Sequence, residues 1–217
     1  MQSYKKYFTD RNFVISFLGG VVLLTLSLVT QFFISGYVDR SASLPVTDII
    51  LSNTRVYDVD TIFIWGSIIL TIFGAWVALR RVNTTPFLMK SVALFTIIRS
   101  VFVSLTHISP FPTHAIIDSA FFNKEAFAGI FTGNDLFFSG HTGIPFLLAL
   151  IFWENKTLRV IFLGFSAMFA VVVLLGHLHY SIDVLSAFFI TYSIFHICQI
   201  FFKKDWKLFN LKKDETL

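Results

Sequence analysis

Two short segments hold the residues best suited to chemistry. One is the sequence Ser-Gly-His-Thr at 139–142, and the other is 177–183, which includes His179 and Asp183. On a helix, residues four apart share one face, so the carboxylate of Asp183 can approach the imidazole of His179. It would accept a proton from one ring nitrogen and fix the tautomer, which leaves the other nitrogen as a nucleophile or base.

A second imidazole, that of His141, is expected to lie beside this pair. The 38 residues between His141 and His179 correspond to about 57 Å of helix, close to twice the ~30 Å core of a bilayer. The chain would cross and return, which puts both histidines at the same membrane depth on neighbouring antiparallel helices. We interpret His141, His179 and Asp183 as catalytic residues for phosphoryl transfer. The competing interpretation is that they are satisfied packing residues.

The residues around His141 suit an anion. Ser139 is a good helix N-cap, and Gly140 lets a ligand approach the backbone. The free N–H groups of a helix start favour a phosphate, and Pro145 fits early in such a helix. The candidate substrate-binding residues are Arg99, Asp135, Ser139, Gly140, Thr142 and Tyr180.

Arg99 is a cation within an apolar segment, and its forked donors match a phosphate. Alternatively, it extends outward to lipid headgroups, as Lys90 is expected to do at the opposite end of the same segment.

Other residues receive no catalytic role. A zinc site from His141, His177, His179 and Asp183 is conceivable, but the Ser-Gly sequence suits an anion better, so no metal is expected. His107 and His114 lie in or near a predicted loop and His196 in the predicted core. Cys198 is expected to be a small buried hydrophobic residue.

The composition is that of a membrane protein. Of 217 residues, 55% are hydrophobic and 14% are charged, whereas soluble domains carry roughly 25% charged residues. The apolar runs are continuous, unlike the alternating segments of a transmembrane barrel. We predict a single all-α integral membrane domain, 1–217, with six transmembrane helices. Their approximate bounds are Phe13–Val38, Thr61–Leu79, Phe87–His107, Leu136–Trp153, Val160–Gly176 and Tyr180–Phe202.

The distribution of basic residues predicts the orientation. Lys and Arg concentrate in the termini and alternate loops, with 13 on one side of the predicted spans and three on the other. By the positive-inside rule both termini are cytoplasmic, the candidate site is on the non-cytoplasmic side, and 203–217 is a short basic cytoplasmic tail. Anionic lipid headgroups, rather than nucleic acid, are the expected partners of these basic residues. A bacterial cytoplasmic membrane is favoured.

The segments 135–142 and 177–184 resemble the two signature motifs of the sphingomyelin synthase family, a branch of the type 2 phosphatidic acid phosphatase superfamily. The stretch from Ile98 to Pro110 is similar to a third motif, and 44–50 resembles an outer-loop motif more faintly. The resemblance spans 44–202. It departs at Gly133-Asn134, where the synthase motif has Cys-Gly. The absence of a cation at 170–176 separates the chain from the phosphatase branch.

The resemblance implies a mechanism without metal or cofactor. His179 would attack phosphorus, Asp183 would orient it, and His141 would protonate the departing lipid alkoxide. The phosphohistidine-type intermediate would pass its group to a lipid alcohol such as ceramide or diacylglycerol, with a phospholipid as donor.

Two alternatives remain. A lipid phosphatase or phospholipase would use water as the acceptor. A lipid scramblase or transporter would be no enzyme, and it would place polar residues through the whole membrane depth.

Overall fold

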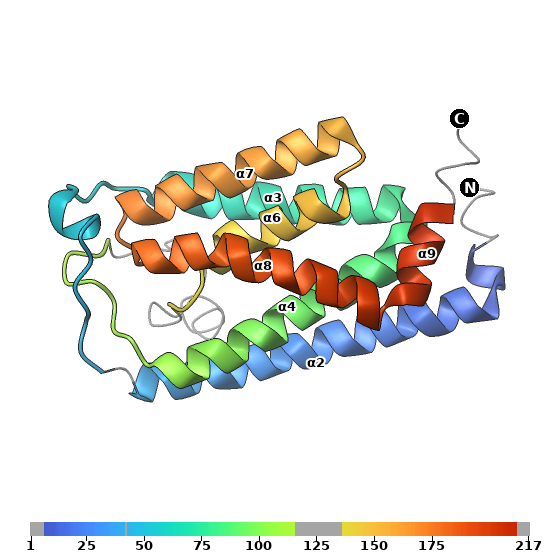
Figure 1. The fold of residues 1–217 in the computed structure, drawn as a ribbon, viewed down its shortest axis with the longest axis horizontal. Coiled ribbons are helices and arrows are strands. Elements are labelled where there is room, and N and C mark those ends of the chain that lie inside the picture. The colour runs from blue at the N-terminus through green and yellow to red at the C-terminus, as the bar shows by residue number, and fades with distance from the viewer. Residues whose placement is uncertain (1–6, 42, 116–135, 212–217) are drawn as a thin grey trace.

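The computed structural model describes residues 7–41, 43–115 and 136–211, and within these ranges it contains helices and no strands. The predicted substrate-binding residue Asp135 lies outside the described residues. The helices are α2 (Arg11–Ser41), α3 (Asp60–Arg80), α4 (Thr85–Thr106), α6 (Gly140–Ile151), α7 (Lys156–Leu175), α8 (Ser181–Phe201) and α9 (Lys203–Leu211), with 3-10 turns η1 (Leu51–Asn53) and η2 (Val82–Thr84) (Figure 1).

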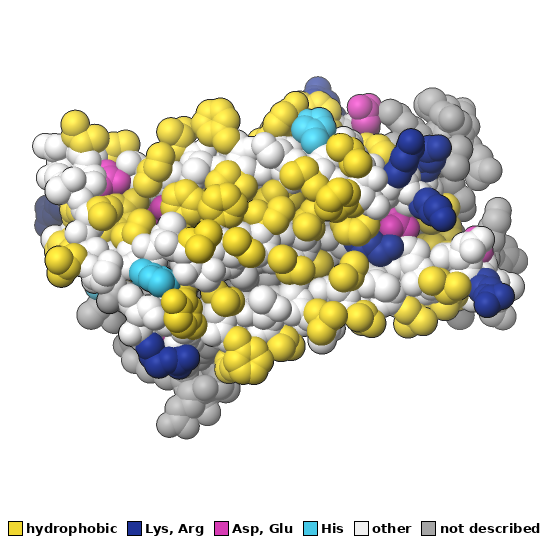
Figure 2. All heavy atoms as spheres, turned by 60° about the horizontal axis from the view of Figure 1, so that its bottom comes forward, with side chains coloured by type: hydrophobic (Ala, Val, Ile, Leu, Met, Phe, Trp, Pro, Cys, Tyr) yellow, Lys and Arg dark blue, Asp and Glu magenta, His cyan; other side chains and the backbone are white. Residues whose placement is uncertain are grey.

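Five helices of the described chain are long and apolar enough to cross a membrane: α2, α3, α4 with its preceding turn η2, α7 and α8. Many of their large hydrophobic side chains are exposed, among them Phe33, Leu79 and Phe189. Hydrophobic side chains extend along the face in Figure 2, whereas Lys and Arg gather mainly at one end. Such a surface is stable against lipid rather than water, and it indicates a multi-pass membrane protein.

The fourth predicted span, Leu136–Trp153, contains a much shorter helix than expected. Helix α6 has 12 residues and is therefore about 18 Å long, too short to cross a bilayer core of about 30 Å. Residues 136–139 are not helical. The carbonyl groups of this segment instead accept hydrogen bonds from side chains of the candidate site, described below. A backbone that serves the site in this way is not part of the helix, which begins only at Gly140.

Helices α6 and α8 lie side by side and run in the same direction. The start of α6 meets the start of α8, where the Ser139 N–H donates to the Asp183 carbonyl over 3.2 Å. Farther along, the rings of Phe146 and Phe188 are 5.1 Å apart. The prediction that His141 and His179 lie on antiparallel neighbours is therefore wrong. The chain crosses in α6 and returns in α7, so α8 starts in the same direction as α6. The helix antiparallel to α6 and α8 is therefore α7.

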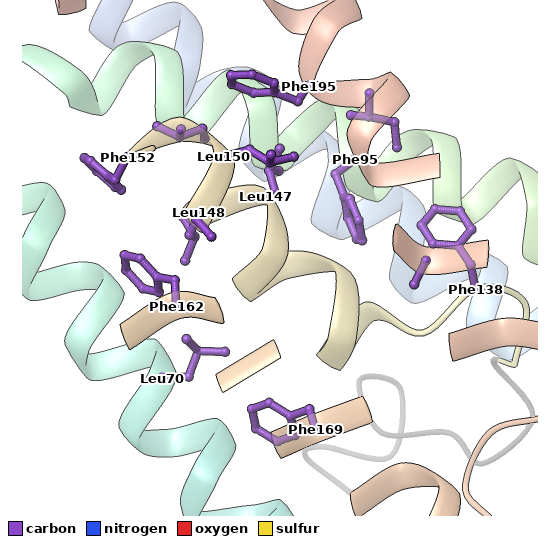
Figure 3. Packing of buried hydrophobic residues seen from close by; sticks show 14 of the residues in the cluster. Leu70, Phe95, Phe138, Leu147, Leu148, Leu150, Phe152, Phe162, Phe169 and Phe195 are labelled. Atoms are coloured by element: carbon purple, nitrogen blue, oxygen red, sulfur yellow. The ribbon is translucent and has the colours of Figure 1, made fainter. Parts of the chain in front are cut away.

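The core surrounds α6. Buried Leu147 and Leu148 from this helix and Phe152 at its C-cap pack with Phe162 of α7 and Phe195 of α8. Figure 3 shows these side chains around the α6 ribbon. Helix α6 also approaches its neighbours closely at Gly143. A Cβ atom there would lie 2.7 Å from the Phe95 ring. The short helix is thus enclosed by longer ones and needs no lipid-facing surface of its own.

A polar cluster joins three helices at the end of the bundle where α9 lies. Lys90 of α4 bonds Asp205 of α9 over 2.6 Å, and both residues bond the Ser16 hydroxyl of α2. Trp206 of α9 packs on Phe87. Lys90 therefore does not extend to headgroups, as was predicted, because Asp205 offers it a partner within the protein.

Two further predictions concern α8. Cys198 is fully buried, as expected. His196 is exposed instead of belonging to the core, and its imidazole contacts the Tyr192 ring at 4.5 Å. The mean hydropathy of a span does not reveal which of its faces meets lipid, and this is why the burial of His196 was misjudged.

Candidate active site

His179 precedes helix α8 rather than lying on it. The helix begins at Ser181, with Tyr180 as its N-cap, so His179 and Asp183 lie on either side of the helix start. The Asp183 carboxylate turns back and accepts a hydrogen bond from the Tyr180 N–H over 3.0 Å. Asp183 is fully buried, and His179 is 7% exposed. The predicted pairing on one helical face is thus replaced by a pairing across the first turn.

A backbone carbonyl, rather than Asp183, receives the hydrogen bond of the His179 ring. Nδ1 of His179 lies 3.0 Å from the Leu136 carbonyl oxygen and 3.5 Å from Asp183 Oδ2. A carbonyl can only accept, so Nδ1 carries the proton and Nε2 has the free lone pair. The distance to Asp183 exceeds that of a normal hydrogen bond. Its carboxylate therefore acts on the ring chiefly through its charge.

Arg99 turns inward from α4 to the same non-helical segment. Its Nε donates to the Phe138 carbonyl over 2.9 Å, and the side chain is 8% exposed. Its guanidinium group packs against the start of α6, where a Cβ on Gly140 would lie 3.3 Å from Nε. The alternative in which Arg99 reaches outward to lipid headgroups does not describe this conformation.

The start of α6 presents backbone donors beside Arg99. Ser139 is the N-cap as predicted, and its hydroxyl accepts from the Thr142 N–H at 3.4 Å. The N–H groups of Gly140 and His141 have no acceptor within the described part of the chain. Free N–H groups together with the helix dipole favour an anion.

His141 occupies the first turn of α6 between two aromatic rings. Its ring centroid lies 4.4 Å from that of Phe63 on α3 and 5.5 Å from that of Phe169 on α7. The charge of Arg99 is near enough to act on it electrostatically. Two histidines, a carboxylate and a guanidinium group therefore gather where α4, α6 and α8 meet.

Two other predicted substrate-binding residues are enclosed by protein. Thr142 is fully buried and Tyr180 is 1% exposed. The Tyr180 hydroxyl accepts from the Val46 N–H over 3.2 Å and donates to the Ser109 carbonyl over 2.8 Å. It thereby joins two loops to the start of α8. Contact of either residue with a substrate stays a prediction.

Asp48 is the polar residue whose place in the site the sequence did not predict. Its carboxylate accepts from the Ser181 N–H and hydroxyl over 2.7 and 2.8 Å, and from the N–H groups of Ile50 and Leu51. Burial acts to raise the pKa of Asp48, but these hydrogen bonds outweigh it and hold the pKa below its ordinary value of 3.8. The available signals were a lone aspartate followed by a short turn, which is common in loops, and the faint resemblance of 44–50 to an outer-loop motif.

His177 supports the turn before α8. It has a left-handed backbone, with φ 53°, and its Nδ1 lies 2.7 Å from the Thr113 hydroxyl. Burial lowers the pKa of His177 below its ordinary value of 6.5. No three His, Cys, Asp or Glu side chains of the described ranges are grouped closely enough to hold a metal ion. The four residues of the conceivable zinc site therefore do not form a ligand set.

Comparison with known proteins gives one family match. Residues 132–200 match the model described as PAP2 superfamily C-terminal, a range that includes His141, His179 and Asp183 but less than half of the chain. The match supports assignment to the type 2 phosphatidic acid phosphatase superfamily and an enzymatic activity on lipid phosphates. It does not test the sphingomyelin synthase-like branch. No curated protein and no solved structure matches the chain.

Proposed function

We propose that the protein is a membrane-embedded lipid phosphotransferase that moves a phospho-headgroup from a phospholipid to a lipid alcohol such as ceramide or diacylglycerol. One observation carries the proposal. The Nδ1 atom of His179 donates a hydrogen bond to the Leu136 carbonyl, which leaves Nε2 as the nucleophile. This histidine lies near the start of α6, against which Arg99 packs. A nucleophile, an anion-binding helix start and a second imidazole together suit phosphoryl transfer.

In the first half-reaction, Nε2 of His179 attacks phosphorus and forms an N–P bond. The P–O bond to the donor lipid breaks, and the leaving alkoxide takes a proton from the His141 imidazolium. The Asp183 carboxylate stabilises the positive charge that develops on the phosphorylated ring. Arg99 and the α6 N–H groups stabilise the negative charge on the phosphoryl oxygens.

In the second half-reaction, the acceptor hydroxyl gives its proton to neutral His141, and its oxygen attacks phosphorus. The N–P bond breaks, and His179 returns to its first state. His141 lies between the rings of Phe63 and Phe169. The negative charge of a bound phosphate beside this ring favours the imidazolium form that acts as the acid.

The second candidate uses water as the acceptor and is a lipid phosphatase or phospholipase. The match to the PAP2 superfamily favours this candidate as well, because the first half-reaction is the same. The two activities differ only in which molecule takes the phosphoryl group from His179.

The test follows the labelled headgroup. Purified protein in nanodiscs receives phospholipid with a radioactive phosphate, with ceramide, with diacylglycerol or with neither. Chromatography then shows the product, and we expect transfer to a lipid alcohol. Release of a water-soluble phosphate or phospho-headgroup alone would replace the proposal with the phosphatase or phospholipase.

Variants assign the roles. His179→Ala should abolish turnover. His141→Ala should slow a lipid donor by roughly 10²–10⁴-fold but slow a nitrophenyl donor far less, since that leaving group needs no proton. The control is His196→Ala, on the exposed face of α8. Normal turnover by His179→Ala would remove the proposed nucleophile.

We further propose that the site faces the non-cytoplasmic side of a bacterial cytoplasmic membrane and that α9 lies on the cytoplasmic side. Ser52→Cys and Lys204→Cys, in a Cys198→Ser background, place one thiol at each end of the bundle. An impermeant reagent applied to intact cells should label the first and spare the second. The reverse pattern would invert the proposed orientation.

A further inference from the structure

Asp48 connects two parts of the protein that lie near His179. One part is the start of α8, where the N–H and the hydroxyl of Ser181 both donate to the Asp48 carboxylate. The other is the start of the turn η1, where the N–H groups of the N-cap Ile50 and of Leu51 donate to the Asp48 carboxylate over 2.8 and 3.1 Å. The carboxylate is thus shared between two elements that are far apart in the sequence.

The turn η1 reaches the carbonyl that bonds His179. Leu51, Leu136 and Tyr180 are each at most 4% exposed and form one hydrophobic cluster. Leu51 is bonded to Asp48 through its N–H, and Leu136 supplies the carbonyl acceptor of His179 Nδ1. The turn η1 therefore packs against both the residue that carries the acceptor and the N-cap residue of α8.

Asp48 also supplies a cap that α8 lacks in its own sequence. The N-cap residue is Tyr180, whose hydroxyl bonds the Val46 N–H and the Ser109 carbonyl, and Asp183 returns to the Tyr180 N–H. The N–H of Ser181 is satisfied by Asp48 instead. A carboxylate at a helix start is favoured by the helix dipole, so Asp48 stabilises the start of α8 at Ser181.

We propose that Asp48 is a positioning residue, which fixes the direction of the His179 imidazole by holding the start of α8 against the turn η1. The inference rests on the proposed function, because it assigns a purpose to the orientation of His179. Asp48 itself does not touch the reacting atoms, and its 7% exposure leaves its carboxylate occupied by four donors.

The test is the variant Asp48→Asn. Its amide has the shape of the carboxylate, but only one of its two terminal atoms can accept, so it cannot accept from both η1 and Ser181. The control is Asp58→Asn, an exposed acid of the same loop. Rapid mixing with radioactive donor lipid measures the rate constant and the amplitude of phosphoenzyme formation. We expect the rate constant to fall roughly 10–100-fold while the amplitude per total protein is kept, and the control to behave like the parent protein.

The two parameters separate positioning from folding. A residue needed only for folding would lower the amplitude and leave the rate constant unchanged, and that result would overturn the inference. Parent protein without any phosphoenzyme would instead refute the proposed function. In that case ¹⁵N spectra of His179, assigned with His179→Gln, decide about Asp48 alone. We expect a clean Nδ1–H tautomer in the parent and mixed tautomers in Asp48→Asn, and identical spectra would overturn the inference.

Discussion

The side chains of His179 and Arg99 each donate a hydrogen bond to a backbone carbonyl of the segment 136–139. The bond of His179 Nδ1 to the Leu136 carbonyl leaves Nε2 for a substrate, and the bond of Arg99 Nε to the Phe138 carbonyl fixes the direction of the guanidinium group. A side chain held in this way loses rotamer freedom before the substrate arrives, so less entropy is lost on binding. The residue-scale predictions therefore concern groups whose orientation, rather than whose presence, matters.

Arg99→Lys should keep the charge but lose activity. Lysine has one terminal nitrogen, so it cannot bond the Phe138 carbonyl and present a planar fork to a phosphate. We expect kcat/KM to fall roughly tenfold or more, measured with the labelled donor in nanodiscs. Arg40→Lys, an exposed arginine at the end of α2, is the control. Full activity of Arg99→Lys would show that a point charge suffices.

His177 predicts a dependence of stability on pH. Because burial lowers the pKa of His177 below 6.5, protonation is easier in the unfolded chain. The stability that it contributes is present above about pH 6.5 and is lost as the pH falls below that value. We expect the Tm in detergent to drop by a few degrees on acidification. His177→Asn, which tolerates the positive φ, should flatten this dependence, and an unchanged slope would contradict the prediction.

At the scale of elements, the shortness of α6 determines how the site is built. The longer helices α4, α7 and α8 enclose it, and its first turn lies where Ser166 of α7 donates to the Thr142 carbonyl. Ser166 is near the middle of α7, so the start of α6 is recessed from the end of that helix. Close packing on all sides holds this recessed start in place.

Gly143→Ala should destabilise this packing. The added Cβ would lie 2.7 Å from Phe95 and 2.9 Å from the Thr191 hydroxyl, so α6 must move or the ring must turn. We expect a loss of about 1–3 kcal/mol, measured by thermal unfolding in detergent. Gly164→Ala on α7 has no atom within 4 Å of the new Cβ and should be neutral or stabilising. Equal effects of the two variants would contradict the packing argument.

The sequence predicted which residues meet but not how they are held. Hydropathy located the helices, and the chain length between His141 and His179 returned both to one end of the bundle. The chain length alone does not give the direction of a helix, which depends on the number of membrane crossings. For this reason the helices that follow His141 and His179 were wrongly expected to be antiparallel. Chain length also misses the carbonyls of Leu136 and Phe138, because a backbone group has the same chemistry in every residue. Asp48 was missed because its partner Ser181 is distant in the sequence.

At the scale of the whole molecule, the two ends of the bundle are fastened by different means. At the end that carries the site, loops bond to the turn between α7 and α8, for example through Tyr57 to Leu175 and Ala115 to Gly176. At the other end, α9 is joined to α2 and α4 through Asp205. The contact between α9 and the bundle therefore bears on stability rather than on chemistry.

Asp205→Asn should destabilise the protein without changing the catalytic rate constant. Lys90 and Asp205 have side chains that are 12% and 8% exposed, so loss of one partner leaves a buried charge unpaired and costs about 3 kcal/mol. The double variant Lys90→Met with Asp205→Leu should recover most of this loss, as judged by thermal unfolding. Asp10→Asn, an exposed acid at the same end, is the control. No recovery in the double variant would show that the pair is not the cause.

The acceptors at 136 and 138 have a consequence for how such a site evolves and how it is mapped. Since the oxygen atoms that orient His179 and Arg99 belong to peptide bonds, substitution of Leu136 or Phe138 leaves them in place. A mutational scan would register these positions as packing residues, and related chains are free to differ there in side-chain identity. Only replacing the peptide bond after Leu136 by an ester, which weakens its carbonyl as an acceptor, would expose its contribution.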